Sequence, residues 1–207
     1  MYSLSKLCAL KQRNANLVMR IAQHAQSKGV KLTDRAYTTL MQAIGDMEGG
    51  GGVVESVWGV LEGMKRDNVT PNSYTYSAAI HAVRQNGEEV MRIWDRMSQE
   101  GVLKNEYTYA ITISALARAG GLYVNKALAL YQEMCMTGLS PNVYTYNSVV
   151  RAFAETGNIH QAMHVVDMMV EKNVQPTQHT YTMLLLACGR GNVSETSVYD
   201  NRISDSS

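Results

Sequence analysis

Apolar residues recur along the chain with the spacing of one face of an α-helix. Some stripes begin at a tyrosine, as in Tyr37/Leu40/Met41/Ile44, Tyr76/Ala79/Ile80/Val83 and Tyr146/Val149/Val150/Phe153. Other stripes end at a methionine, as in Val57/Val60/Leu61/Met64 and Ala162/Val165/Val166/Met169. Offsets of three, four and seven residues are typical of amphipathic helices, and no stretch alternates as a half-buried strand would. The pattern predicts an all-α protein.

Both kinds of stripe repeat with one period. The tyrosines that open stripes are separated by 39, 33, 37 and 35 residues; they are Tyr37, Tyr76, Tyr109, Tyr146 and Tyr181. The methionines that close stripes are separated by 33, 37 and 35 residues; they are Met64, Met97, Met134 and Met169. A fixed period near 35 indicates a tandem repeat of two helices. The longest spacing contains the glycines at 49–52, which we interpret as a longer surface loop.

The ends of the second helices carry a common signal. The residue four positions after each methionine, or after Ala25, is always Gly or Asn: Gly29, Asn68, Gly101, Gly138 and Asn173. These residue types tolerate the left-handed conformation that closes a helix. An aliphatic residue follows each of them, as the hydrophobic contact of such a cap requires. Pro71, Pro141 and Pro176 then prevent the helix from continuing.

Two short helices cannot bury their apolar stripes alone, so each pair has to stack on its neighbours as a solenoid. We therefore expect about five helix–turn–helix repeats with the tyrosine and methionine ladders in the core. A degenerate repeat is expected at 1–33. Four repeats follow at 34–72, 73–105, 106–142 and 143–177, then the first helix of a further repeat at 178–191 and a polar tail at 192–207.

The repeats resemble the pentatricopeptide repeat family. The family's unit opens roughly as valine-valine-threonine-tyrosine-asparagine and ends as glycine-isoleucine-lysine-proline-aspartate. In this chain Val143-Tyr-Thr-Tyr-Asn147 and Gly138-Leu-Ser-Pro-Asn142 come closest, and the similarity extends over about 3–191. The tryptophan, glycine and alanine signatures of the tetratricopeptide repeat are absent. The resemblance implies a right-handed α–α superhelix that binds single-stranded RNA, one base per repeat. It also implies RNA processing, stability, splicing or translation in a mitochondrion or plastid.

The resemblance implies two main base-reading residues per unit, the fifth and the last. The pairs are Thr38 with Asn72, Ser77 with Asn105, Ala110 with Asn142, and Asn147 with Thr177, while Thr182 belongs to a further unit. The first two pairs imply adenine, because a small hydroxyl leaves room for a purine and an amide can donate and accept together. Ala110 offers no polar group, and Asn147 with Thr177 implies a pyrimidine. The implied target is 5′-A-A-N-pyrimidine-3′, parallel to the chain.

Two further contacts with RNA are implied. The family's second residue packs against bases, and here it is Arg35, Tyr74, Tyr107, Tyr144 and His179. The tyrosine rings can stack on bases, or they can pack between neighbouring helices. Phosphate contacts belong near the end of the first helix, where Lys11, Arg118 and Arg190 stand. Asp46, Gln85 and Glu155 take this place in other units, so we expect a shallow salt dependence.

The charge of the chain leaves a second hypothesis open. A net charge of +1 is low for a protein that binds nucleic acid. Residues 1–33 carry +6, and the remaining residues therefore sum to −5. The basic segment suits either an RNA-facing surface or a targeting sequence, and we favour a folded segment because its second half fits the repeat. The near-neutral total favours a protein-binding scaffold within a large organellar complex.

Other kinds of chemistry find little support in the sequence. His160, His164 and Asp167 have a spacing that can hold a metal, but they lack the glutamate of an HExxH site. No histidine is followed two residues later by Glu, and there is no C-x-x-C, as a zinc deaminase needs. Cys8, Cys135 and Cys188 show no disulfide framework. We expect no enzyme, no cofactor, no metal, no small-molecule substrate and no membrane partner.

Overall fold

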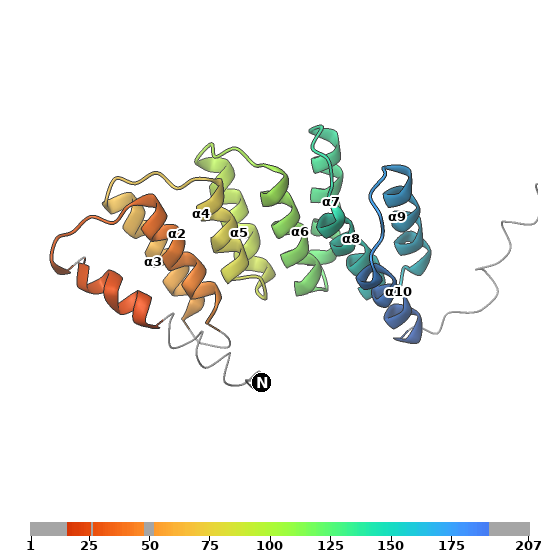
Figure 1. Cartoon of the computed structure of the whole chain (residues 1–207), viewed down its shortest axis with the longest axis horizontal. Coiled ribbons are helices and arrows are strands. Elements are labelled where there is room, and N and C mark those ends of the chain that lie inside the picture. Colours follow the sequence, from red (N-terminus) through yellow and green to blue (C-terminus); the bar gives the residue numbers. More distant parts are fainter. Residues whose placement is uncertain (1–15, 26, 48–51, 191–207) are drawn as a thin grey trace, which may run out of the picture.

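A computed structural model describes residues 16–25, 27–47 and 52–190, and helices joined by turns make up all of this part of the chain. The first helices of the repeats are α2 (Asp34–Gly45), α4 (Ser73–Ala82), α6 (Glu106–Ala119), α8 (Val143–Glu155) and α10 (Gln178–Arg190). The second helices are α3 (Val53–Arg66), α5 (Gly87–Gln99), α7 (Tyr123–Met136) and α9 (Ile159–Glu171). A helical segment at 16–25 precedes them. The predicted all-α solenoid is confirmed (Figure 1).

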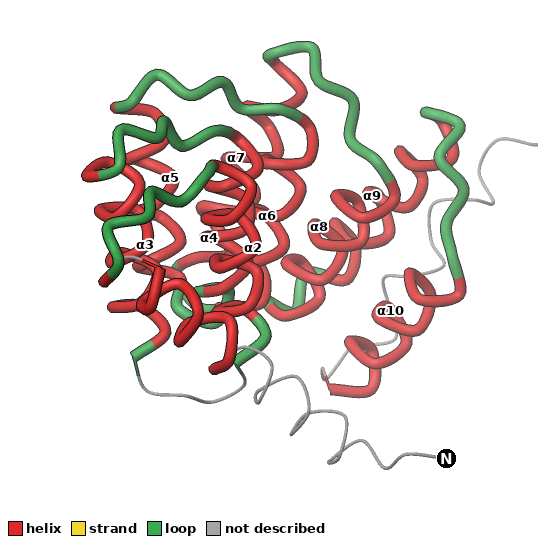
Figure 2. Tube along the Cα trace, turned by 60° about the vertical axis from the view of Figure 1, so that its left-hand side comes forward, coloured by secondary structure: helices red, strands yellow, loops and turns green. Residues whose placement is uncertain are grey.

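The helices form two layers. Each first helix packs on the first helix of the next repeat, from α2 through α4, α6 and α8 to α10. Each second helix packs on the first helix of its own repeat and on that of the following one. Figure 2 shows α2, α4 and α6 in one row, with α3 and α5 beside them. The first helices thus form a continuous surface, which we call the first-helix face.

The tyrosine and methionine ladders form the core, as predicted. Met64, Met97, Met134 and Met169 are fully buried, as are Tyr37 and Tyr76, and Tyr109 and Tyr146 are nearly so. The prediction is wrong for Tyr181, which is 51% exposed. Tyr37, Tyr76 and Tyr109 each hydrogen-bond to an acid in or at the end of the second helix of their own repeat. The corresponding segment after α10 lies beyond residue 190, outside the described residues.

The predicted helix ends are confirmed at every repeat. Gly29, Asn68, Gly101, Gly138 and Asn173 all have positive φ, between 58° and 79°. The main-chain N–H of the aliphatic residue that follows donates to the carbonyl of Ala25, Met64, Met97, Met134 or Met169, five residues back. This bond satisfies a carbonyl that the helix end would leave free. None of the described helices has the length and apolar character needed to cross a membrane.

Candidate nucleic-acid interface

An asparagine caps α4, α6 and α8, and this asparagine is the predicted closing reader of the preceding unit. The Oδ1 atoms of Asn72, Asn105 and Asn142 accept the main-chain N–H of Thr75, Thr108 and Thr145 at 3.0, 2.9 and 3.0 Å. Asparagine is among the favoured capping residues because its oxygen satisfies a free N–H of the first turn. The predicted closing reader of one unit is therefore also the N-cap of the first helix of the next unit.

Capping fixes which way each amide points. The hydroxyls of Thr75, Thr108 and Thr145 also donate to the asparagine oxygens, at 3.3, 2.9 and 3.2 Å. An amide oxygen has two lone pairs, and both are thereby occupied. In this structure the oxygens of these three amides therefore face the start of the helix that they cap. Only the Nδ2 hydrogens are left, and that of Asn105 has a long contact of 3.5 Å with Ser73 Oγ.

A buried threonine joins the two predicted readers of a unit. Thr108, which is fully buried, accepts a long 3.4 Å hydrogen bond from Ser77 Oγ and donates to Asn105. Thr75 lies 3.5 Å from Thr38 Oγ1 and donates to Asn72. The structure thus brings these two predicted pairs together across the boundary between two repeats.

The bridging threonine is also present for the readers of the unit 143–177, whereas the unit 106–142 lacks the contact with its fifth residue. Thr180 Oγ1 donates to Asn147 Oδ1 at 2.6 Å and accepts the main-chain N–H of Thr177 at 3.0 Å. In the unit 106–142 the fifth residue is Ala110, so Thr145 has no polar partner there. The role of these threonines was not predicted, although their recurrence before the ladder tyrosines at 76, 109, 146 and 181 is visible in the sequence.

The predicted readers lie at different depths. Ser77 is 1% and Ala110 is 2% exposed, so neither side chain reaches the surface in this structure. Thr38, Asn72 and Asn147 are half-buried. The exposed readers are Asn105, Asn142, Thr177 and Thr182. The closing residue, rather than the fifth, is therefore the more accessible member of the two middle pairs.

Tyrosines at the second position stand out from the first-helix face. Tyr74 and Tyr107 are 67% and 56% exposed, which argues against packing between helices as their main role. They line a hollow of about 480 Å³ together with Thr38, Gln42 and His81. Two further second-position residues, Arg35 and His179, are also exposed. The hollow thus places aromatic faces beside a predicted reader.

Tyr144 is held differently from the other two tyrosines. Its hydroxyl donates to Ser114 Oγ at 2.8 Å, which ties the start of α8 to the middle of α6. The residues of α6 from Thr108 to Ala117 are all buried. The hydrogen bond therefore bridges the first-helix face at the unit whose fifth residue is Ala110.

Basic side chains near the ends of the first helices are few. Arg118 is exposed, as the phosphate hypothesis requires, whereas Lys11 and the side chain of Arg190 lie outside the described residues. Arg84 was not among the predicted phosphate contacts; its Nη1 donates to the carbonyls of Gly45 and His81 at 3.2 and 2.9 Å. Burial and the nearby Arg84 lower the pKa of His81, which keeps this imidazole neutral at pH 7.

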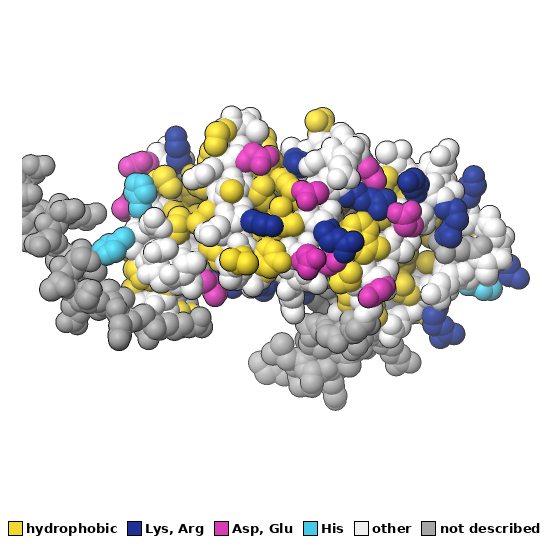
Figure 3. All heavy atoms as spheres, turned by 180° about the vertical axis from the view of Figure 1, so that it is seen from behind, with side chains coloured by type: hydrophobic (Ala, Val, Ile, Leu, Met, Phe, Trp, Pro, Cys, Tyr) yellow, Lys and Arg dark blue, Asp and Glu magenta, His cyan; other side chains and the backbone are white. Residues whose placement is uncertain are grey.

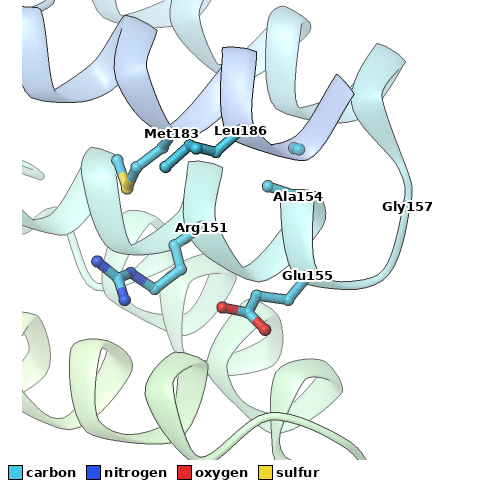
Figure 4. Close-up of a pocket in the computed structure, with 7 residues that line it drawn as sticks. Arg151, Ala154, Glu155, Gly157, Met183 and Leu186 are labelled. Carbon is cyan, nitrogen blue, oxygen red and sulfur yellow. The ribbon is translucent and has the colours of Figure 1, made fainter. Parts of the chain in front are cut away.

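A second hollow, of about 250 Å³, lies between α8 and α10. Figure 4 shows Arg151 and Glu155 extending from one side of α8, while Met183 and Leu186 point from α10 towards α8. Arg151 follows Tyr146 at the same offset at which His81 follows Tyr76. The face therefore carries a cation here next to an acid, which limits its attraction for phosphate.

The histidine cluster considered in the sequence lies on the second-helix layer. His160, His164 and Asp167 are exposed on α9. Across the described ranges, no three residues of metal-binding type come together. The surface seen in Figure 3 carries basic and acidic side chains interspersed, without a single large patch of either sign.

Solved structures share the fold of this chain. The pentatricopeptide repeat protein PPR10 in complex with an 18-nt psaJ RNA element matches 90% of the chain, with a TM-score of 0.72 and 22% identity. A structure of PPR10 from maize matches 87% of the chain, with a TM-score of 0.62 and 25% identity. The chain spans only 27% and 26% of these two PPR10 chains.

A third match is nearly complete in both directions. The pentatricopeptide repeat domain of Arabidopsis thaliana protein-only RNase P 1, in complex with tRNA, has a TM-score of 0.67 and 15% identity. The match covers 90% of this chain and 97% of that domain. No curated protein matches the chain by sequence.

The family model described as the pentatricopeptide repeat domain matches residues 59–118 and 129–191, which together exceed half of the 207 residues. The matched ranges contain the caps, the buried threonines and most of the tyrosine ladder. The chain belongs to the pentatricopeptide repeat family.

Proposed function

We propose that this protein binds single-stranded RNA along the first-helix face, with about one base per repeat. The observation that carries the proposal is that three of the four predicted reader pairs meet at one buried threonine, which makes a polar site that recurs with the spacing of the units. The similar structures of PPR10 in complex with an RNA element and of the RNase P 1 domain in complex with tRNA support it. The proposed activity is binding alone, in RNA processing, stability, splicing or translation in a mitochondrion or plastid.

The outward amide nitrogens decide which bases suit the closing asparagines. Adenine N1 and cytosine N3 are acceptors at the centre of the pairing edge, whereas guanine N1 and uracil N3 carry a hydrogen. A donor-only asparagine therefore favours adenine or cytosine. Small residues at Thr38 and Ser77 leave room for the larger of these two bases. We therefore keep 5′-A-A-N-pyrimidine-3′ as the proposed target, with the second-position tyrosines stacking on the bases.

The sharpest test exchanges one amide for a carboxylate. Asn105→Asp retains a capping oxygen, because Asp and Asn cap helices equally well, and it replaces the outward donor with an acceptor. Affinity is measured by fluorescence anisotropy with RNAs 5′-A-X-A-U-3′ in constant flanks, where X is each base in turn. The wild type should prefer X = A. The variant should shift towards U or G, by roughly tenfold for one exchanged hydrogen bond.

A matched control separates this effect from charge and stability. Asn86 caps α5 on the second-helix layer by accepting the N–H of Glu89 at 3.2 Å. Asn86→Asp adds the same charge at the same kind of position, and it should leave the base preference unchanged. An unchanged preference in Asn105→Asp would refute the assignment of this reader. A chain that bound neither A-rich nor U-rich RNA would instead favour the scaffold hypothesis, which the interspersed charges support (Figure 3).

A further inference from the structure

We infer that a buried threonine at the third position of a unit is a positioning residue for the base selectivity of the preceding unit. The residues concerned are Thr75, Thr108 and Thr180, each of them fully buried. Because these hydroxyls are buried, each acts through the two readers of the preceding unit, with which it makes polar contacts. The inference rests on the proposed RNA binding and names the part of the fold that sets its specificity.

Thr180 shows the positioning most directly. Asn147 lies within α8, where no capping bond holds its side chain. Its Oδ1 accepts a 2.6 Å hydrogen bond from Thr180, which is a short and strong contact for a hydroxyl donor. This bond turns the oxygen of Asn147 inwards and leaves the Nδ2 donors for a ligand. Without it, the amide is free to present either end, and an amide that presents either end does not discriminate between donors and acceptors.

Thr108 adds a link between the two readers of its unit. Its hydroxyl proton goes to Asn105 Oδ1 at 2.9 Å, and its oxygen accepts from Ser77 at 3.4 Å. A buried hydroxyl without a partner costs free energy, so the loss of one of these two bonds would also destabilise the other. The threonine comes from the repeat that follows the two readers. Selectivity of one unit therefore depends on correct stacking of the next.

The experiment replaces the hydroxyl by a methyl group of similar shape. Thr108→Val is tested with RNAs that vary the second base of the target, and Thr180→Val with RNAs that vary the fourth base. Each variant should reduce the ratio of affinities between the preferred base and the others by roughly 3- to 10-fold, which corresponds to one hydrogen bond. Thr108→Ser and Thr180→Ser keep the hydroxyl and should retain the wild-type ratio.

Thr112→Val provides the matched control. Thr112 is also fully buried in α6, and its hydroxyl donates to the main-chain carbonyl of Thr108 at 2.7 Å, away from both readers. It should lower the melting temperature as much as Thr108→Val while leaving the affinity ratios intact. Equal weakening for all bases in Thr108→Val and Thr180→Val, or a loss of ratio in Thr112→Val, would overturn the inference. Failure of the wild type to bind RNA would instead refute the proposed function itself.

Discussion

At the scale of single residues, the core tyrosines end on acids. The hydroxyls of Tyr37, Tyr76 and Tyr109 donate to Asp67, Glu100 and Glu133, each at 2.6 Å. The hydrogen bond from Tyr37, followed by one from the Leu32 N–H, lowers the pKa of Asp67. Burial alone would raise the pKa of Glu100, but the bonds from Tyr76 and Arg96 outweigh burial and lower it. These tyrosines therefore stabilise the repeats through hydrogen bonds as well as through apolar packing.

The lowered pKa of Glu100 gives a prediction about acid stability. Because the pKa is lower in the folded state, the interaction contributes fully above the ordinary value of 4.5 and is lost as the pH falls through the folded value. Tyr76→Phe should lower the free energy of unfolding by about 1 kcal/mol at neutral pH. The difference from the wild type should shrink near pH 3. Urea denaturation at both pH values measures it.

The exposed Tyr74 supplies the comparison for this measurement. Its ring is 67% exposed, so Tyr74→Phe should change the free energy of unfolding little at either pH. A deficit in Tyr76→Phe that stays the same size at pH 3 would show that the carboxylate is not involved.

Residues whose role is local could be predicted from the sequence. Asn68 and Asn173 have the predicted left-handed conformation because a helix end depends on only a few neighbouring residues. The burial of Ser77 could not be predicted in this way. It depends on how closely α4 and α6 pack, and Thr108 comes from the next repeat.

At the scale of the helices, one glycine controls how α5 meets α7. A Cβ atom at Gly87 would come within 2.5 Å of the Tyr123 ring at the start of α7. Asn86 and Gly87 stand at the start of α5. Asn86 caps α5, and the absence of a side chain at the next position admits the ring.

Gly87→Ala should therefore destabilise the protein although alanine favours helices. Displacing the Tyr123 ring costs roughly 1–3 kcal/mol, which exceeds the gain of about 0.5–1 kcal/mol from replacing a helical glycine. Gly59, within α3, is the matched control because a Cβ there would meet nothing within 4 Å. Gly59→Ala should raise the melting temperature, whereas Gly87→Ala should lower it. Stabilisation by both changes would mean that the ring moves aside freely.

At the scale of the whole molecule, affinity is limited by the number of units. Four stacked bases contribute roughly 4–12 kcal/mol, while association costs an estimated 4–15 kcal/mol. The chain spans 27% of the PPR10 chain it matches, so its repeats correspond to a part of that longer solenoid. The sequence predicted the number and stacking of the repeats because each repeat contacts only its neighbours. How deeply the readers are buried in the first-helix face was not predictable, since burial depends on contacts between helices, such as that between Tyr144 and Ser114.

The charge on the first-helix face sets how salt affects RNA binding. Arg118 is exposed near the end of α6, with the acids Asp46 and Glu155 at the equivalent place in other repeats. Each phosphate neutralised on a single strand contributes a slope of about −0.7 to log K against log salt. Arg118→Gln should make the measured slope shallower by about this amount and weaken all RNAs of the base series equally. Arg66→Gln removes an equally exposed arginine from α3, in the second-helix layer, and should change neither quantity. A phosphate contact at the first-helix face would be lost only in Arg118→Gln. A reduced slope in both variants would therefore mean that the protein attracts RNA through its total charge.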